Sequence, residues 1–351
     1  MSLTAQLHTG QLGRWCDARL PGTGELVEAV MTAAAGTPPV RPDGPVRGQH
    51  WASIGGAFGQ RLAFLVDPAA PVYPLLGALA AGILTPSSAH AAAAQFPGAG
   101  LPAVDTNQLA GIDVEPDVDQ AAADFLHRLA AYLDQHAPAG HVAAAGVEAG
   151  LARCCWVLAG WETAYRAGRL TPADTELYHG INPVTVEAMR ASASDRVVAE
   201  LVALADRLDR AGLGPLRQLA GDPPAGQPLG LAAPGFVDGW ADGDLLVGDA
   251  LLDVKTVISL REPARIVRWL WQLLGYAWLD RTDHYRIRRV GLYLARHGRL
   301  ITWPLDTYAA TLAGDPAAVE PLRREFVALV DETIAAERVV ASAHRAGTAG
   351  R

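Results

Sequence analysis

Apolar and polar positions follow two different periods along the chain. Through residues 1–220 the apolar positions recur with the spacing of amphipathic helices. Abundant alanine favours helix here but also blurs the period, so the helix ends are set only to within several residues. We therefore predict a mainly helical region with a few breaks. The clearest helices cover 121–136, 143–168 and 185–212, and the breaks fall near 36–48, 96–118 and 171–184.

A different pattern begins after Gly-Asp-Pro-Pro-Ala-Gly at 221–226, a composition typical of a linker. Residues 226–305 contain short apolar runs separated by turn residues, which indicates strands around one long helix. Residues 306–351 add a C-terminal helix over 316–343, followed by a frayed tail. The sequence thus predicts an α/β fold, in which a mixed-sheet core with flanking helices is preceded by a mainly α-helical region.

The core is predicted to contain two hairpins with a helix between them. Asp244–Val247 and Ala250–Lys255 have the composition of strands, and Gly248-Asp249 between them is typical of a two-residue turn. Glu262–Asp280 has helical spacing. The second hairpin consists of Val290–Ala295, a turn at His297-Gly298 and Leu300–Trp303.

The length of the first turn decides which side chains face one another. With a two-residue turn at Gly248-Asp249, Asp244 lies opposite Asp253 and Asp242 lies opposite Lys255. Opposed residues and alternate residues of a strand share a face, so all four charged groups gather on one side of the hairpin. A three-residue turn would shift the register by one and send Asp244 to the other face. Two carboxylates this close predict a bound cation.

One of these four residues, Lys255, is of a type that occurs once in the chain. Of the 29 Lys and Arg residues, Lys255 is the one lysine and all the others are arginine. A guanidinium is a planar fork, whereas an ammonium is a compact charge that fits beside a reacting water. A position that keeps lysine in an arginine-rich chain is therefore a candidate catalytic position.

The charge distribution indicates a possible substrate. The net charge of −8 argues against a chain that coats nucleic acid indiscriminately. Between Lys255 and Arg299, however, ten Lys/Arg face three Asp/Glu, a local balance of +7 that suits a phosphate backbone. The alternative is a solvated arginine face. The candidate nucleic-acid contacts are Arg265, Arg268, Arg286, Arg288 and Arg289.

Several classes of protein are excluded by residues that the chain lacks. A P-loop and a protein kinase each need a lysine in a motif that does not surround Lys255. Three cysteines cannot build a four-cysteine zinc or iron–sulfur site, and the adjacent pair in an apolar helix indicates core packing in a reducing cytoplasm. We expect no signal peptide, and prolines break up the apolar stretch 62–84, a poor membrane span.

Two further segments of the helical region admit two interpretations each. Trp156, Trp161, Tyr165 and Arg166 could stack nucleic-acid bases, but an aromatic stripe on a helix is more often core. Gly55-Gly56-Ala-Phe-Gly59 has the composition of a phosphate loop, yet follows no convincing strand, so turns or close helix contacts are the preferred interpretation.

Asp244, then Asp253-x-Lys255, then Gln272-x-x-x-Tyr276 on the following helix resembles the PD-(D/E)XK nuclease superfamily, in particular its RecB-like and exonuclease-like branch. The resemblance covers about residues 226–305. Arg268, Gln272 and Tyr276 are spaced four residues apart and so share one helix face. The first motif has Gly-Asp where the family has Pro-Asp, and the gap to Asp253 is short. Asp238 is a rival first carboxylate.

The resemblance implies a restriction-endonuclease-like fold and a metal-dependent nuclease, a hydrolase acting on DNA in preference to RNA. It implies that Asp244, Asp253 and the backbone carbonyl of Val254 hold Mg²⁺ or Mn²⁺. Asp242 and Glu200 are further candidate ligands. It also makes Lys255 catalytic and gives Gln272 and Tyr276 positioning roles.

A role in genome defence or DNA processing in the cytoplasm is the biological expectation. The alternatives are a catalytically silent nuclease-like module that binds nucleic acid or protein, and a metalloenzyme with another substrate. The helical region 1–220 is a candidate site for a protein partner, and no membrane contact is expected.

Overall fold

The structure is a computed structural model that describes residues 2–46, 48–98, 101 and 113–349. The helices before the sheet are α1 (Leu3–Thr9), α2 (Gln11–Arg19), α3 (Thr23–Ala33), α4 (Gly48–Val66), α5 (Val72–Ala80), α6 (Pro86–Ala93), α7 (Pro116–His136), α8 (Ala145–Ala167), α9 (Pro172–His179), α10 (Val186–Ala191), α11 (Asp195–Arg207) and α12 (Leu213–Leu219), with a π-helical turn at Leu208–Gly212. The strands are β1 (Gly230–Ala232), β2 (Gly235–Val237), β3 (Ala241–Asp242), β4 (Leu245–Val247), β5 (Ala250–Lys255), β6 (Arg289–Leu294) and β7 (Arg299–Pro304). Three more helices accompany the strands, α13 (Pro263–Leu279), α14 (Leu305–Ala313) and α15 (Val319–Ala349), and 3-10 turns lie at Ala295–His297 and Pro316–Ala318.

The strands form one five-stranded mixed sheet and one small two-stranded sheet. The order in the larger sheet is β1-β4-β5-β6-β7, and β2 pairs with β3 in the smaller one. β4 and β5 form an antiparallel hairpin, β5 and β6 are parallel neighbours connected in the sequence through α13, and β6 and β7 are antiparallel. Both predicted hairpins and the helix between them are therefore confirmed, as is a mixed α/β fold with flanking helices.

The predicted two-residue turn is also confirmed. Val247 pairs with Ala250 and Leu245 with Leu252, which leaves Gly248 and Asp249 as the turn. Gly248 has φ +58°, a conformation that favours glycine. A Cβ there would also lie 2.1 Å from the carbonyl oxygen of Leu219, so the turn is pressed against the end of α12.

The predicted pairing of Asp242 with Lys255 is wrong. Asp242 pairs with Gly235 in the small sheet. The backbone N–H of Gly243 donates to the carbonyl of Pro234, and Asp244 accepts at its carbonyl from Ala233. The chain before β4 thus bonds to residues 233–235 and leaves the hairpin, which a pattern of alternating residues does not reveal.

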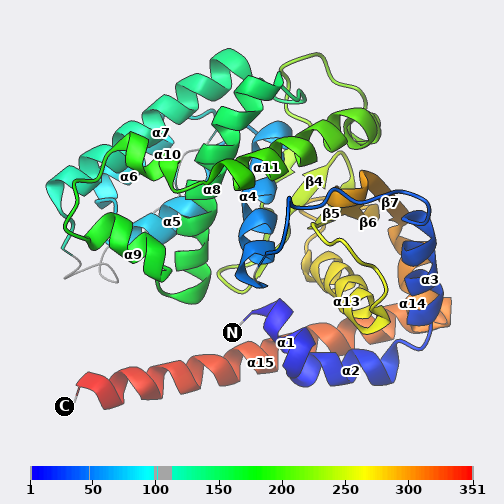
Figure 1. Cartoon of the computed structure of the whole chain (residues 1–351). Coiled ribbons are helices and arrows are strands. Elements are labelled where there is room, and N and C mark those ends of the chain that lie inside the picture. Colours follow the sequence, from blue (N-terminus) through cyan, green and yellow to red (C-terminus); the bar gives the residue numbers. More distant parts are fainter. Residues whose placement is uncertain (1, 47, 99–100, 102–112, 350–351) are drawn as a thin grey trace.

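Helices cover both faces of the large sheet, each around its own core. Leu245, Val247, Ala250, Leu252 and Tyr293 face a core that also contains side chains of α4 to α12. Leu246, Leu251, Val290, Leu292 and Leu294 face a second core, shared with α1 to α3 and α13 to α15. Figure 1 shows α4, α8 and α11 on one side of the strands and α13 and α15 on the other. Asp253 and Lys255, alternate with Leu251, therefore point toward α13.

Most of the predicted helices are present, with differences at three places. The stretches 121–136 and 143–168 are helical, and 36–48 is a break. The predicted helix 185–212 is interrupted at residues 192–194, between α10 and α11. The predicted break at 171–184 contains α9, whose Thr171 side chain caps the first turn. α15 continues to Ala349, through most of the predicted tail. The predicted break at 96–118 lies largely outside the described residues.

None of the helices in the described part of the chain combines the length and apolarity needed to cross a bilayer.

A buried ion pair joins α4 to α8 within the first core. Arg61 and Glu148 are each 4% exposed, and the guanidinium donates two hydrogen bonds of 2.8 and 2.7 Å to the carboxylate. Glu148→Gln leaves the Arg61 charge buried without a counter-charge, so we expect it to cost about 3–5 kcal/mol in the free energy of unfolding, measured in urea at pH 7. The double variant Arg61→Met/Glu148→Leu should recover most of that loss, and a double variant as unstable as the single one would contradict this explanation.

Candidate active site

A cavity of about 500 Å³ lies where the carboxyl end of β5 meets α13, α4 and α8. Six of the predicted site residues line it together: Asp242, Asp244, Asp253, Lys255, Gln272 and Tyr276. Val254, predicted to contribute a backbone carbonyl, is also at its wall. The structure therefore brings the nuclease-like motif together in one place, although its elements come from the hairpin, the small sheet and α13.

The two central carboxylates differ in exposure. Asp244 is exposed and accepts a hydrogen bond of 2.7 Å from the backbone N–H of Val254. Asp253 is 3% exposed, and its pKa is raised to about 7. Burial is the main cause of this rise, the charge of Lys255 opposes it, and the charge of Asp244 adds to it. The site thus holds one exposed anion beside a buried carboxyl that titrates near neutral pH.

Lys255 lies between Asp253 and α13. Its Nζ is 2.5 Å from Asp253 Oδ2 and 3.4 Å from Gln272 Oε1, and it stands over the ring of Trp269 at 5.6 Å from the ring centre. Although the ammonium is close, no donor in the described residues reaches Asp253 Oδ2 with hydrogen-bond geometry. This oxygen is therefore neutralised by charge but still has capacity to bind a cation or a donor.

Gln272 is fixed by three contacts. Its Oε1 accepts from Lys255, and its Nε2 donates to Thr4 Oγ1 and to the Tyr276 hydroxyl, both at 2.8 Å. Burial, followed by the negative charge of Asp253, raises the pKa of Tyr276, so the phenol stays protonated. Thr4 from α1 is a site residue that sequence reasoning missed, because nothing near it in the chain marks a contact with α13.

The wall opposite the carboxylates comes from α4, α5 and α8. Arg166 donates to Asp242 at 2.8 Å and also pairs with Glu162, and its guanidinium lies over the ring of Tyr73. Tyr165 stacks on Tyr73 with ring centres 5.4 Å apart.

The aromatic stripe predicted on α8 divides between core and cavity. Trp161 is 1% exposed and Trp156 packs against the first core, so both belong to the core interpretation. Only Arg166 and the neighbouring Tyr165 reach the region of the cavity.

Glycines of α4 form the remaining part of this wall. Gly55, Gly56 and Gly59 lie within the helix and line the cavity, so the preferred interpretation of close helix contacts is the one that the structure supports. A Cβ at Gly55 would lie 2.8 Å from Thr256 Oγ1, directly after Lys255. Gly59 faces open space, with no atom within 4 Å of a Cβ built there.

Two predicted or rival carboxylates lie elsewhere. Glu200 on α11 is 4% exposed, accepts from Arg296 at 2.5 Å and contacts His50 Nε2 at 2.6 Å. It is not among the residues at the cavity wall, and its oxygens are used within this ion cluster. Asp238, the rival first carboxylate, is exposed in the turn between β2 and β3, also away from the cavity wall.

The predicted basic residues divide between the two ends of the sheet. Arg265 and Arg268 lie on α13 on the side of Lys255, and the charges of Arg268, Lys255 and Arg265, after burial, lower the pKa of His8. At the opposite end, Arg289 pairs with Ala250 in the parallel ladder and bonds to Asp249. Arg286 and Arg288 precede β6 at that end, and Arg288 is paired with Asp283. A local count of charge cannot separate the two groups, because it ignores the direction of the strands.

A divalent metal fits the donor set formed by Asp244 and Asp253. Among the described residues there is no group of three or more His, Cys, Asp or Glu side chains placed to share a metal ion. Mg²⁺, however, commonly takes one or two carboxylates and completes its octahedron with waters and substrate phosphates. Asp253 Oδ2, which pairs with the Lys255 ammonium but accepts no hydrogen bond of regular geometry, and the nearby Asp244 supply hard oxygen ligands of this kind.

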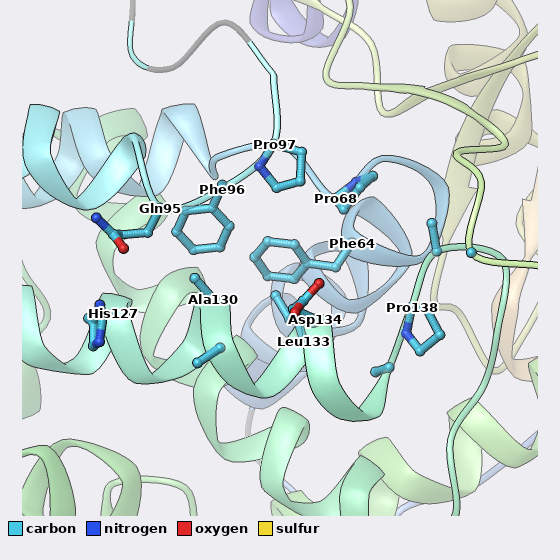
Figure 2. A pocket seen from close by; sticks show the side chains of 14 residues that line it. Phe64, Pro68, Gln95, Phe96, Pro97, His127, Ala130, Leu133, Asp134 and Pro138 are labelled. Carbon is cyan, nitrogen blue, oxygen red and sulfur yellow. The ribbon is translucent and has the colours of Figure 1, made fainter.

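Another cavity, of about 420 Å³, has a different character. Figure 2 shows Phe64 and Phe96 facing one another across it, and their rings are nearly parallel at 6.1 Å. Asp134 is the one carboxylate among its described lining residues. It therefore lacks the paired carboxylates of the cavity at β5.

Metal affinity should depend on pH through Asp253. A carboxyl must lose its proton to bind a metal, and the pKa of Asp253 is about 7. We expect the affinity for Mn²⁺ to be constant above about pH 7 and to fall about tenfold per unit below it. Calorimetric titration between acidic and basic pH, with proton release measured from the buffer dependence, tests this. Asp253→Asn should lose the binding and its pH dependence, whereas equal affinity on both sides of neutrality would remove Asp253 from the ligand set.

Gly59 provides a test of the space in the cavity. Alanine is the better helix former and meets no atom at this position, so Gly59→Ala should raise the free energy of unfolding by about 0.5–1 kcal/mol. Gly59→Leu should keep that stability but fill the cavity, and lower any activity of the site about tenfold or more. Urea unfolding and an activity assay on both variants separate space from stability. Full activity in Gly59→Leu would show that this wall does not border the substrate.

Comparison with known proteins gives no relative for this chain: no family model, no curated protein and no solved structure matches it. The chemistry of the site therefore has to be argued from its own residues. Those residues are two neighbouring carboxylates of unequal exposure, one lysine held between Asp253 and Gln272, and a cavity in front of them.

Proposed function

We propose that the protein is a metal-dependent nuclease that hydrolyses phosphodiester bonds, with a core of the restriction-endonuclease type. The observation that carries the proposal is the convergence of Asp244, Asp253 and Lys255 on one cavity, with Gln272 behind the lysine. A lysine in contact with one carboxylate, with a second carboxylate on the wall of the same open cavity, is an arrangement suited to metal-assisted hydrolysis of a phosphate ester. DNA is the proposed substrate and Mg²⁺ or Mn²⁺ the proposed cofactor.

Each residue has a role that follows from its surroundings. Asp244, Asp253 and the carbonyl of Val254 would hold the metal, which when bound polarises the phosphate and acidifies a water. Lys255 would orient the attacking water and stabilise the negative charge that develops on the phosphate. Gln272 fixes the ammonium through Oε1, and its own orientation is set by Thr4 and Tyr276. The protonated Tyr276 adds no charge to the site.

One observation favours a second candidate function, a nuclease-like module that binds without cutting. The Lys255 ammonium lies 2.5 Å from Asp253 and balances its negative charge, so these two side chains do not need a metal ion for neutrality. The raised pKa of Asp253 weighs against this reading, because a retired site gains nothing from a buried carboxyl that resists ionisation. A metalloenzyme with a substrate other than nucleic acid is the third candidate.

The decisive experiment is cleavage of linear and circular DNA, single- and double-stranded, with Mg²⁺ or Mn²⁺. Lys255→Ala should lower the rate by about 10²–10³ and leave the fold intact, because it removes a charge aimed at the transition state. Lys255→Arg should be nearly as damaging, since the planar fork cannot take the place of the compact ammonium.

Arg210→Gln is the matched control, because Arg210 is exposed and pairs with Asp206 away from the cavity. Its rate should equal that of the wild type. Near-normal cutting by Lys255→Arg would remove the argument from the lysine, and metal-dependent cutting that survives Lys255→Ala would place the reaction elsewhere.

A further inference from the structure

A third cavity, of about 640 Å³, adjoins the candidate active site on the other side of Lys255. Five residues belong to the walls of both cavities: Gly55, Gly56, Val254, Lys255 and Thr256. Lys255 therefore lies between two adjoining cavities, which together we call the cleft. We name the part at Asp244 and Asp253 the acidic cavity, and the part that contains Trp51, Arg265 and Trp269 the aromatic cavity.

The two cavities differ in charge. Glu162, Asp242, Asp244 and Asp253 line the acidic cavity, and its Arg166 is already paired with two of them. In the aromatic cavity the charged residues among the described lining are Lys255 and Arg265, both positive. A cation is therefore attracted to the first cavity and a phosphate backbone to the second.

Trp51 gives the aromatic cavity a surface for stacking. It is 36% exposed, a large exposure for an indole, and Arg296 lies over its ring at 5.2 Å. Arg296 is itself fully buried and also donates to the carbonyl of Thr256 and to Glu200. One buried guanidinium thus fixes Trp51 on α4 to the segment that follows Lys255, so the stacking surface is rigid and held at a set place beside the lysine.

The lining of the aromatic cavity favours an unpaired strand. At the junction α4 and the end of β5 are in contact, since a Cβ on Gly55 would come within 2.8 Å of Thr256 Oγ1, so a strand has to lie along the aromatic cavity and not between these elements. In a double helix the faces of each base are covered by the neighbouring bases. An unpaired strand can place a base against an aromatic ring, with its phosphates toward Lys255 and Arg265.

We propose that the aromatic cavity binds an unpaired nucleotide next to the scissile phosphate, with its base stacked on Trp51 and its backbone against Arg265. The substrate class of the proposed nuclease is then single-stranded nucleic acid or an unpaired end. This inference rests on the proposed function, but it concerns binding and is tested by binding.

The first measurement is fluorescence anisotropy of a short labelled thymidine oligonucleotide in EDTA, which prevents cleavage, beside a blunt duplex of the same length. The single strand should bind at least about tenfold more tightly than the duplex. Trp51→Ala should weaken it about 5- to 100-fold, while Trp51→Phe should stay close to the wild type because a ring remains for stacking.

Two further variants separate stacking from charge and from general damage. Arg265→Gln should reduce the slope of log affinity against log salt by about 0.7, the contribution of one phosphate contact to a single strand. Met31→Ala, at a residue of similar exposure (38%) on α3 outside both cavities, should change nothing. Because Trp51 also contacts Arg296, an oligonucleotide with 5-iodouracil should in addition be cross-linked to wild-type Trp51, identified by mass spectrometry.

The outcomes distinguish this inference from the proposed function. Equal binding by Trp51→Ala and the wild type, or cross-links that avoid Trp51, would overturn the stacking site. Duplex that is bound and cut in preference to single strand would overturn it and leave the nuclease standing. Failure to bind or cut any nucleic acid would overturn both. Parallel titrations with uridine RNA show whether the strand is DNA or RNA, and dependence on Trp51 in either one supports the site.

Discussion

The two-residue turn at Gly248-Asp249 sets the register on which the site depends. It places Leu245 opposite Leu252, so both point into the core on the side of α4 and α8. Asp253 and Lys255 then point the other way, toward α13. One extra residue in the turn would exchange the two faces, burying leucines in the cavity and charges in an apolar core. The contact of Gly248 with Leu219 on α12 is what makes this turn hard to lengthen.

That register has an energetic consequence at Asp253. The same face that receives Asp253 is apolar for most of its length, so the carboxyl is buried and its pKa rises to about 7. Lys255, two residues later on the same face, offsets the buried charge at 2.5 Å. Gln272 on α13 accepts from the lysine and is itself held by the Tyr276 hydroxyl. Burying the Asp253 carboxyl at this position lowers the free energy of unfolding. Such a cost to stability is typical of positions where a side chain serves binding or chemistry.

Sequence reasoning was successful where the controlling interactions are local. The hairpin, its register and α13 follow from short-range patterns, and they alone bring Asp244, Asp253, Lys255 and Gln272 together. The preference for Asp244 over Asp238 agrees with their placement, because only Asp244 bonds to the strand that carries Asp253. The resemblance to a nuclease superfamily remains a prediction.

What the sequence could not supply depends on contacts between distant segments. Glu200 looked like a ligand but forms an ion cluster with Arg296 and His50, residues far from it in the chain. Asp242 does not pair with Lys255 as predicted, because its strand pairs with the segment at Gly235 in the small sheet. The basic residues between Lys255 and Arg299 do not form one surface. Because β5 and β6 are parallel, the residues that follow β5 and those that precede β6 lie at opposite ends of the strands. No periodicity encodes these arrangements.

The same long-range contacts give the cleft its polarity. Among the described residues, α4 contributes no charged side chain to the wall of either cavity. Instead it offers the backbone of Gly55, Gly56 and Gly59 toward the acidic cavity and Trp51 toward the aromatic one. Arg296 joins the two walls by contacting both Trp51 and the carbonyl of Thr256. Because Arg296 also pairs with Glu200 on α11, the distance between α4 and β5 is set by a buried ion cluster and not by a flexible loop. In the proposed binding of an unpaired strand, the width available beside Lys255 is therefore set by the position of α4, and the residues of α4, more than the carboxylates, would select what fits.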